Sequence, residues 1–139
     1  MKLFSLACLL LVLGSALSSD GRDWRPQMPE HISLLQLIAT PERYDGKLVA
    51  VTGFLHLEFE EDILYLHEED YRERISKNGV WVERNALLKD LRSGLDLHYV
   101  SVVGVFDSAN KGHMSSASGS LKNITSASLW PPVIVPLQR

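Results

Sequence analysis

The stretch KLVAVTGFLHLEFEEDILYLH, from Lys47 to His67, decides the fold. From Val49 to Phe59 the residues divide into two alternating sets, and a period of two is the signature of a β-strand. The acidic pair Glu60-Glu61 is the expected turn, and a second strand follows it. We expect one set to face the core: Val49, Val51, Gly53, Leu55, Leu57 and Phe59.

The other face of this hairpin is a candidate binding surface. With Glu60-Glu61 as the tight turn, the predicted register places His56 opposite Tyr65. Apolar and polar side chains mix on this face, which a strand pair facing only solvent does not require. A slip of one residue would exchange the two faces. The residues gathered there are Phe54, His56, Glu58, Ile63, Tyr65 and His67.

Further short elements flank the hairpin. Ser33 is placed as the N-cap of a short helix with an apolar face, and Pro41 ends that helix. Asp45-Gly46 marks a turn into the first strand. Glycines inside strands, here Gly53 and Gly104, mark a bulge or a bend. The pattern predicts a helical or irregular segment over 68–75, strands over 80–83, 98–107 and 120–128, and a helix over Asn85–Gly94, ended by its glycine.

The order strand, strand, strand, helix, strand, strand resembles an OB-fold. We therefore expect a mainly β fold with short helices: a five-stranded OB-like Greek-key barrel with a helix between strands 3 and 4 and a short N-terminal helix. The segments YDGKLVAVTGFLHLE, ILYLHEEDY, HYVSVVGVFD and KGHMSSASGSLKNIT are similar to a family of exported bacterial OB-like domains of unknown function, related to the tRNA-anticodon-binding type of OB barrel. The resemblance covers Ile32 to Ser126 and implies a single OB domain outside the cytoplasm.

The N-terminal residues have the pattern of a secretory signal peptide. Met1-Lys2 provide a positive start, Leu3–Leu13 an apolar run too short for a membrane span, and Gly14–Ser18 small residues at cleavage spacing. The single cysteine, Cys8, lies in that run, so we expect a mature chain without disulfides and without a lipid anchor. The expected organisation is a signal peptide over 1–18, a flexible leader over 19–31, the OB-like domain over 32–128 and a Pro-rich tail over 129–139. This predicts a secreted or periplasmic protein with no transmembrane segment in the mature chain.

Charge disfavours a nucleic-acid partner. The formal net charge is −3, and removal of Lys2 with the signal peptide makes the mature chain more acidic. Nucleic-acid binding relies on clustered Lys and Arg, whereas the basic residues of this chain are scattered. The expected partner is an envelope protein, a peptide or a saccharide.

No sequence motif frames a nucleophile or a metal, so we predict a binding module without a cofactor, a metal or catalytic residues. The alternative is a small His-dependent hydrolase or metal-dependent enzyme that uses His56, His67 or His113. Trp81 is a core residue or a binding platform, and His113 either locks its loop or meets a ligand, the first being favoured. The candidate ligand-binding residues are Phe54, His56, Tyr65, His67, Trp81 and His113, and the candidate structural residues are Gly46, Gly53, Gly104, Gly112 and Asn123.

Overall fold

The structure, a computed structural model, describes residues 27–132. This part of the chain is mainly β with short helices, as predicted, but the sheet has six strands instead of the expected five, because Glu30–His31 also pairs with the first long strand. The predicted signal peptide, most of the predicted leader and residues 133–139 of the predicted tail lie outside the described residues. Between residues 27 and 132, no helix has both the length and the apolar character needed to cross a membrane.

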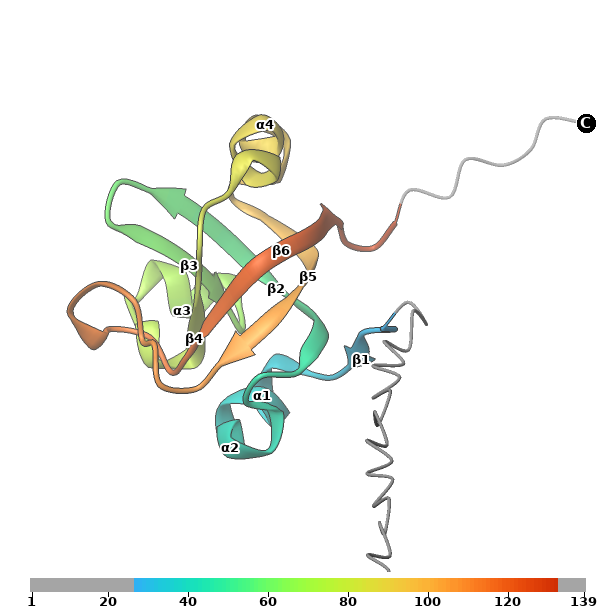
Figure 1. Ribbon diagram of the computed structural model, residues 1–139. Coiled ribbons are helices and arrows are strands. Elements are labelled where there is room, and N and C mark those ends of the chain that lie inside the picture. The colour runs from blue at the N-terminus through green and yellow to red at the C-terminus, as the bar shows by residue number, and fades with distance from the viewer. Residues whose placement is uncertain (1–26, 133–139) are drawn as a thin grey trace, which may run out of the picture.

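Twelve short elements make up the described residues (Figure 1). The strands are β1 Glu30–His31, β2 Leu48–Glu58, β3 Glu61–Tyr65, β4 Gly79–Val82, β5 His98–Asp107 and β6 Ser120–Leu129. The α-helices are α1 Leu34–Ala39, α2 Pro41–Tyr44, α3 Glu68–Arg72 and α4 Ala86–Leu95, and the 3₁₀ helices are η1 Ser76–Asn78 and η2 His113–Ser115. β1 and the last residue of β6 lie in segments predicted as leader and tail.

The strand β2 organises the sheet because it changes partners along its length. Its first eight residues pair antiparallel with β5, and its last five pair antiparallel with β3. The pairings continue from β3 to β4, from β4 to β6 and from β6 to β5, which returns to β2. The β4–β6 pair is parallel, whereas the other four pairs of this series are antiparallel.

Gly53 pairs with β5 and directly precedes Phe54 and Leu55, the residues of β2 that pair with both β5 and β3. A Cβ atom at this position would lie 2.5 Å from the carbonyl oxygen of Tyr65 and 2.9 Å from Cγ of Leu64. Real Cβ atoms do not approach a backbone oxygen so closely, so a side chain at Gly53 would push β3 away from β2. Glycine is therefore required for the close approach of the two strands.

The strand β6 bulges opposite Gly104 of β5. The register shifts between Val103 and Val105, because Lys122 pairs with Val105 whereas Ser126 pairs with Val103. Asn123 lies in the extra segment with a φ of +51°, a left-handed conformation that asparagine tolerates better than most residues. A Cβ at Gly104 would lie 2.7 Å from Cδ1 of Ile124, so the bulged strand packs directly over this glycine.

The predicted hairpin register was wrong by two residues. Phe54 pairs with Tyr65, and Glu58 pairs with Glu61, which leaves a two-residue turn of Phe59 and Glu60. Glu60 is the left-handed residue of this turn, with a φ of 64°. The shift keeps both faces because it is even, but it moves Phe59 from the expected core into the turn, where it is 83% exposed. It also removes His67 from the hairpin.

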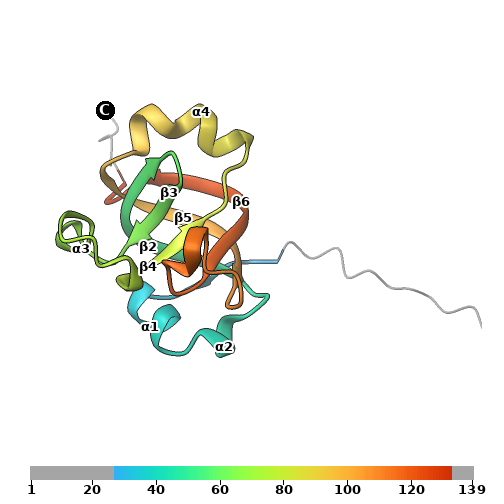
Figure 2. The same ribbon diagram turned by 90° about the vertical axis from the view of Figure 1, so that its left-hand side faces the viewer.

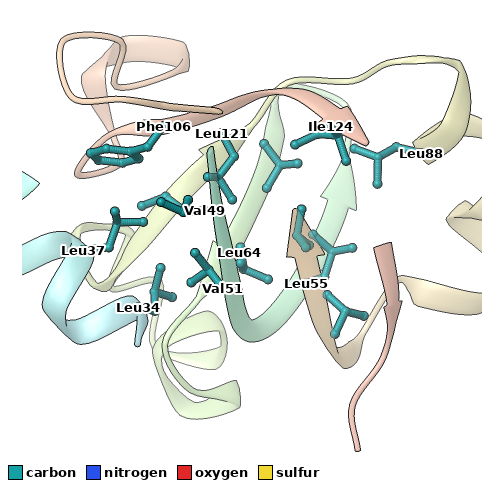
Figure 3. Close-up of a cluster of buried hydrophobic side chains, with 14 of the residues drawn as sticks. Leu34, Leu37, Val49, Val51, Leu55, Leu64, Leu88, Phe106, Leu121 and Ile124 are labelled. Carbon is teal, nitrogen blue, oxygen red and sulfur yellow. The ribbon is translucent and has the colours of Figure 1, made fainter. Parts of the chain in front are cut away.

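The core lies between the strands, with helices at its two ends. Figures 1 and 2 show α4 over one end of the sheet and α1 with α2 at the opposite end. In Figure 3, Leu34 and Leu37 of α1 and Leu88 of α4 point toward the buried strand residues. The core residues labelled on the strands are Val49, Val51, Leu55, Leu64, Phe106, Leu121 and Ile124.

Local caps start the two helices that close the core. Ser33 accepts a hydrogen bond from the backbone N–H of Gln36 (3.1 Å), so α1 begins where predicted. Asn85 accepts one from the N–H of Leu88 (3.1 Å) and donates its amide to the carbonyl of Ile124 (2.7 Å), which joins α4 to the β6 bulge. The predicted end of α4 at Gly94 was wrong, because the helix continues by one residue and buries Leu95.

Candidate functional site

The polar-aromatic face of β2 and β3 is covered by α3. Phe54 and Tyr65 are buried in a small cluster with Ile63, and Tyr71 of α3 packs against it. The Tyr71 ring centroid lies 5.6 Å from that of Phe54 and 5.9 Å from that of Tyr65. Phe54 therefore has a packing role under α3 instead of an open, ligand-facing position.

Tyr65 combines this packing with a polar contact. Its hydroxyl donates a hydrogen bond to Oε1 of Glu61, at 2.7 Å. Burial, together with the hydrogen bond from the tyrosine to this carboxylate, raises the pKa of Tyr65 far above its ordinary value. The hydroxyl therefore stays protonated and orients Glu61 toward the surface.

His56 is a candidate residue whose buried ring lies between two carboxylates. Its side chain is only 9% exposed, and its ring lies against Tyr71 with 4.5 Å between centroids. Nε2 lies 3.2 Å from Oε2 of Glu58, and Nδ1 lies 3.5 Å from Oδ1 of Asp96 without hydrogen-bond geometry. A carboxylate therefore faces each ring nitrogen.

A pocket of about 270 Å³ opens beside His56. The β2–β3 hairpin contributes carboxylates to its wall. The helix α3 and the segment after it contribute a hydroxyl and two guanidinium groups. Arg72 is paired with Glu68 at 2.6 Å. The residues lining this pocket are His56, Glu58, Glu61, Tyr71, Arg72 and Arg74.

The loop between β5 and β6 is held against Trp81. Gly112 has a φ of +69°, and a Cβ there would lie 2.3 Å from two atoms of the Trp81 ring, so the loop backbone rests on the indole. Lys77 fastens the same loop through hydrogen bonds from Nζ to the carbonyls of Ser115 (2.7 Å) and Ala117 (3.1 Å). Trp81 is thus a platform for the protein's own loop.

His113 lies on that loop and faces the hairpin turn. Its half-exposed ring places Nε2 3.9 Å from Oε2 of Glu60. A second pocket of about 200 Å³ lies here, between the turn, η1 and the loop, and Met114 at its edge is 87% exposed. The favoured expectation that His113 locks the loop is not what the contacts show, because Lys77 and Gly112 make the anchoring contacts described above.

Both pockets include Glu61 and Arg74, so they lie next to each other on either side of these two residues, and we call the two pockets together the Glu61 groove. It follows the outer side of the β2–β3 hairpin, from His56 at one end to His113 at the other (the region of β3, α3 and the 108–119 loop in Figure 2). His67 does not line it, because that residue precedes α3 and its backbone N–H donates to Asp70 (3.0 Å). The two pockets together present carboxylates, guanidinium groups and imidazoles.

A smaller pocket of about 150 Å³ lies beside α4, and its cationic residues are mostly engaged. Arg84 makes two hydrogen bonds to Asp62, at 2.6 and 2.7 Å, and Arg92 donates to the carbonyl of Leu57. These contacts brace the hairpin. The Glu61 groove is therefore the stronger candidate site.

Sequence reasoning missed Glu61, Tyr71, Arg74 and Asp96. Glu61 was assigned to the turn, and the one-residue shift of the turn into Phe59-Glu60 makes it a strand residue. Tyr71 and Arg74 come from a segment without a clear period, and Asp96 reaches His56 across the fold.

Comparisons of this chain with protein-family models, with curated proteins and with solved structures found no match.

Proposed function

We propose that the domain is an OB-fold barrel that acts as an exported binding module for a peptide ligand. The series of pairings that returns from β5 to β2 supports a closed barrel. The parallel β4–β6 pair and the position of α4 between β4 and β5 in the chain support the Greek-key order of the OB-fold. The family resemblance over Ile32 to Ser126 is a further argument for this assignment.

The observation that carries the proposal is the position of the Glu61 groove. The turn between the first two barrel strands and the loop between the last two frame it, and these are the loops that frame the usual ligand face of OB-folds. Ligand sites are concave and present a few convergent polar groups, which this groove also does.

The charges of the groove favour a peptide over a nucleic acid. Glu58 and Glu61 can accept hydrogen bonds from an amine or from backbone N–H groups, and Arg74 can donate to a carboxylate or a carbonyl. A phosphate backbone would meet the carboxylates of Glu58, Glu60 and Glu61. A peptide carries both kinds of partner.

Ligand-induced shifts in the amide NMR spectrum of the protein would test this proposal. The probes are short peptides with free termini, a set of disaccharides and an oligothymidine strand. We expect only the peptides to shift signals around Glu61, Arg74 and His113. We expect Arg74→Gln to weaken binding roughly tenfold, the scale of one charge-assisted hydrogen bond. Lys89→Gln, in the pocket beside α4, is the matched control and should bind normally.

Either of two results would overturn the peptide proposal. One is a saccharide or the oligonucleotide binding where the peptides do not, with salt-dependent affinity in the case of the oligonucleotide. The other is peptide affinity that survives Arg74→Gln but falls in Lys89→Gln. Export is tested separately, by N-terminal sequencing of the protein recovered from the native host. Recovery of Met1, or a lipid on Cys8, would contradict the predicted signal cleavage.

A small His-dependent or metal-dependent enzyme is the second candidate. The cluster of His56 with Glu58 and Glu61 favours it, because a buried imidazole beside carboxylates can move a proton. Hydrolysis of ester or peptide substrates that disappears in His56→Gln and persists in His113→Gln would support this candidate. Equal hydrolysis by both variants would contradict it.

A further inference from the structure

We infer that His56, Glu58 and Glu61 form a binding site for a divalent metal ion of the zinc type. One ligand atom from each residue can be chosen so that all three lie within 4.8 Å of one another. Three protein ligands with one position open to a pocket is the usual arrangement of a zinc site that also binds water or a further ligand. The open position here faces the end of the Glu61 groove that His56 lines.

The surroundings of the buried imidazole point to a cation. Carboxylates face both ring nitrogens, Glu58 at Nε2 (3.2 Å) and Asp96 at Nδ1 (3.5 Å). A neutral ring has one N–H and one lone pair, so one nitrogen would present its lone pair to a carboxylate. A cation at Nε2, either a proton or a metal ion between Nε2 and Glu58, removes this repulsion, and the N–H of a metal-bound ring would then face Asp96.

Two hydrogen-bonded groups hold the proposed ligands in position. Metal-binding histidines usually direct their second nitrogen to a carboxylate, and Asp96 lies 3.5 Å from Nδ1, near enough to accept its N–H after a small rotation of the ring. Asp96 is itself fixed, because its Oδ1 accepts the backbone N–H of Leu57 at 2.8 Å. Glu61 is oriented by the hydroxyl of Tyr65. The groups that would make the outer contacts of a metal site therefore lie beside the three ligands.

The balance of charge supports a dication. Glu58, Glu61 and Asp96 bring negative charge to the imidazole, whereas Arg72 is paired with Glu68. Arg74 opposes a cation from the pocket wall. A bound dication would neutralise Glu58 and Glu61, and Arg74 would then favour an anionic group, such as a peptide carboxylate, at the open position.

The ligand set selects the metal. Imidazole with two carboxylates suits Zn²⁺ or similar transition ions, whereas Mg²⁺ prefers oxygen ligands and retains its water. Metal binding does not depend on the ligand proposed for the groove, so it can be measured on the protein alone.

Titration of the metal-free protein with zinc chloride in a calorimeter tests the inference, with magnesium chloride as the comparison. We expect one Zn²⁺ per chain and no measurable heat from Mg²⁺. His56→Gln and Glu61→Gln should each weaken zinc binding at least tenfold, and Asp96→Asn roughly 10- to 100-fold, as for other outer contacts. Melting of each metal-free variant shows whether it is folded.

The matched control is the pair at the other end of the groove. His113→Gln and Glu60→Gln remove a histidine and a glutamate that also face each other, at 3.9 Å, and should leave zinc binding unchanged. No zinc binding by the parent protein would overturn the inference. So would full binding by a folded His56→Gln variant, or loss of binding in His113→Gln alone. Peptide binding is titrated separately, with and without zinc, so that a failure of the zinc inference can be told apart from a failure of the peptide proposal.

Discussion

Replacement of Gly112 by alanine should detach the loop between β5 and β6 from Trp81. Gly112 has a φ of +69°, and the added methyl carbon would lie 2.3 Å from two atoms of the indole ring. The ring has little room to retreat, because it packs against the Phe54, Ile63 and Tyr65 cluster. The loop must rise or the ring must turn, and either movement changes one wall of the Glu61 groove.

Two costs add at this position. With a φ of +69° and a ψ of −162°, Gly112 lies in a backbone region nearly confined to glycine, which costs another residue roughly 1–3 kcal/mol. Overpacking against a ring adds about 1–3 kcal/mol. If the loop rises instead, the two hydrogen bonds from Lys77 break, at about 1 kcal/mol each. Both routes make the Gly112→Ala cost exceed the backbone penalty alone.

Gly46→Ala is the matched control for the backbone penalty. Gly46 has a φ of +72°, close to that of Gly112, but a Cβ there has no atom within 4 Å. The two glycines are matched in φ alone, so the comparison shows an extra cost at Gly112, and removal of the indole then shows whether Trp81 causes it. At roughly 4–8 °C per kcal/mol for a domain of this size, Gly112→Ala should melt at least about 4 °C below Gly46→Ala.

Thermal melting followed by circular dichroism gives this difference, and the same variants are repeated in a Trp81→Leu background. There the extra cost of Gly112→Ala should largely disappear. Equal melting temperatures of Gly112→Ala and Gly46→Ala would refute the reasoning. An extra cost that persists without the indole would refute it as well, because the strain would then come from another contact.

Three further variants test the strands, a helix cap and one ion pair. Gly53→Val should lower the melting temperature more than Gly104→Val, because the nearest atom to a Cβ is a backbone oxygen at 2.5 Å at Gly53 but the end of a side chain at 2.7 Å at Gly104, where the backbone oxygen is 3.0 Å away. A double variant as stable as the parent would contradict the close strand packing. Asn85→Ala should lower the free energy of unfolding by about 1 kcal/mol for the lost cap and by about 1–3 kcal/mol more for the unpaired carbonyl of Ile124. In urea unfolding this loss should be larger than that of Ser33→Ala, which removes only a cap. The hydrogen bond from Lys122 holds the pKa of Asp107 below its ordinary value. The stabilisation of the fold by this ion pair is therefore complete above about pH 4, and it is lost as the pH falls through the lowered pKa. Asp107→Asn should therefore lower stability at pH 7 and flatten its decline in acid, and an unchanged acid slope in urea unfolding would contradict this.

Much of the fold could be predicted because its signals are local. The alternation through Val49–Leu57 reflects the two faces of one strand, and the cap at Ser33 reflects contacts within one helical turn. The strand over His98–Asp107 was predicted with the bounds that the structure shows. β1 was not predicted, because two exposed residues carry no period.

The candidate site was predicted less completely. His56, Tyr65 and His113 do line the Glu61 groove, whereas Phe54 and Trp81 are packing residues and His67 lies outside it. The groove residues that were not predicted come from segments whose position in the fold cannot be inferred from a local sequence pattern. The signal peptide and export stay predictions.

The sequence by itself determined which segments become strands and helices, since periodicity, caps and turn residues act over a few neighbouring residues. Only the tertiary structure decided the hairpin register, the cover of Tyr71 over Phe54 and the meeting of His56 with Asp96. These depend on the path of the whole chain: His56 and Asp96 come together because β2 and the end of α4 pack at the same end of the sheet. Contacts between distant residues are selected by the burial and close packing of the complete core, which no single stretch of sequence encodes.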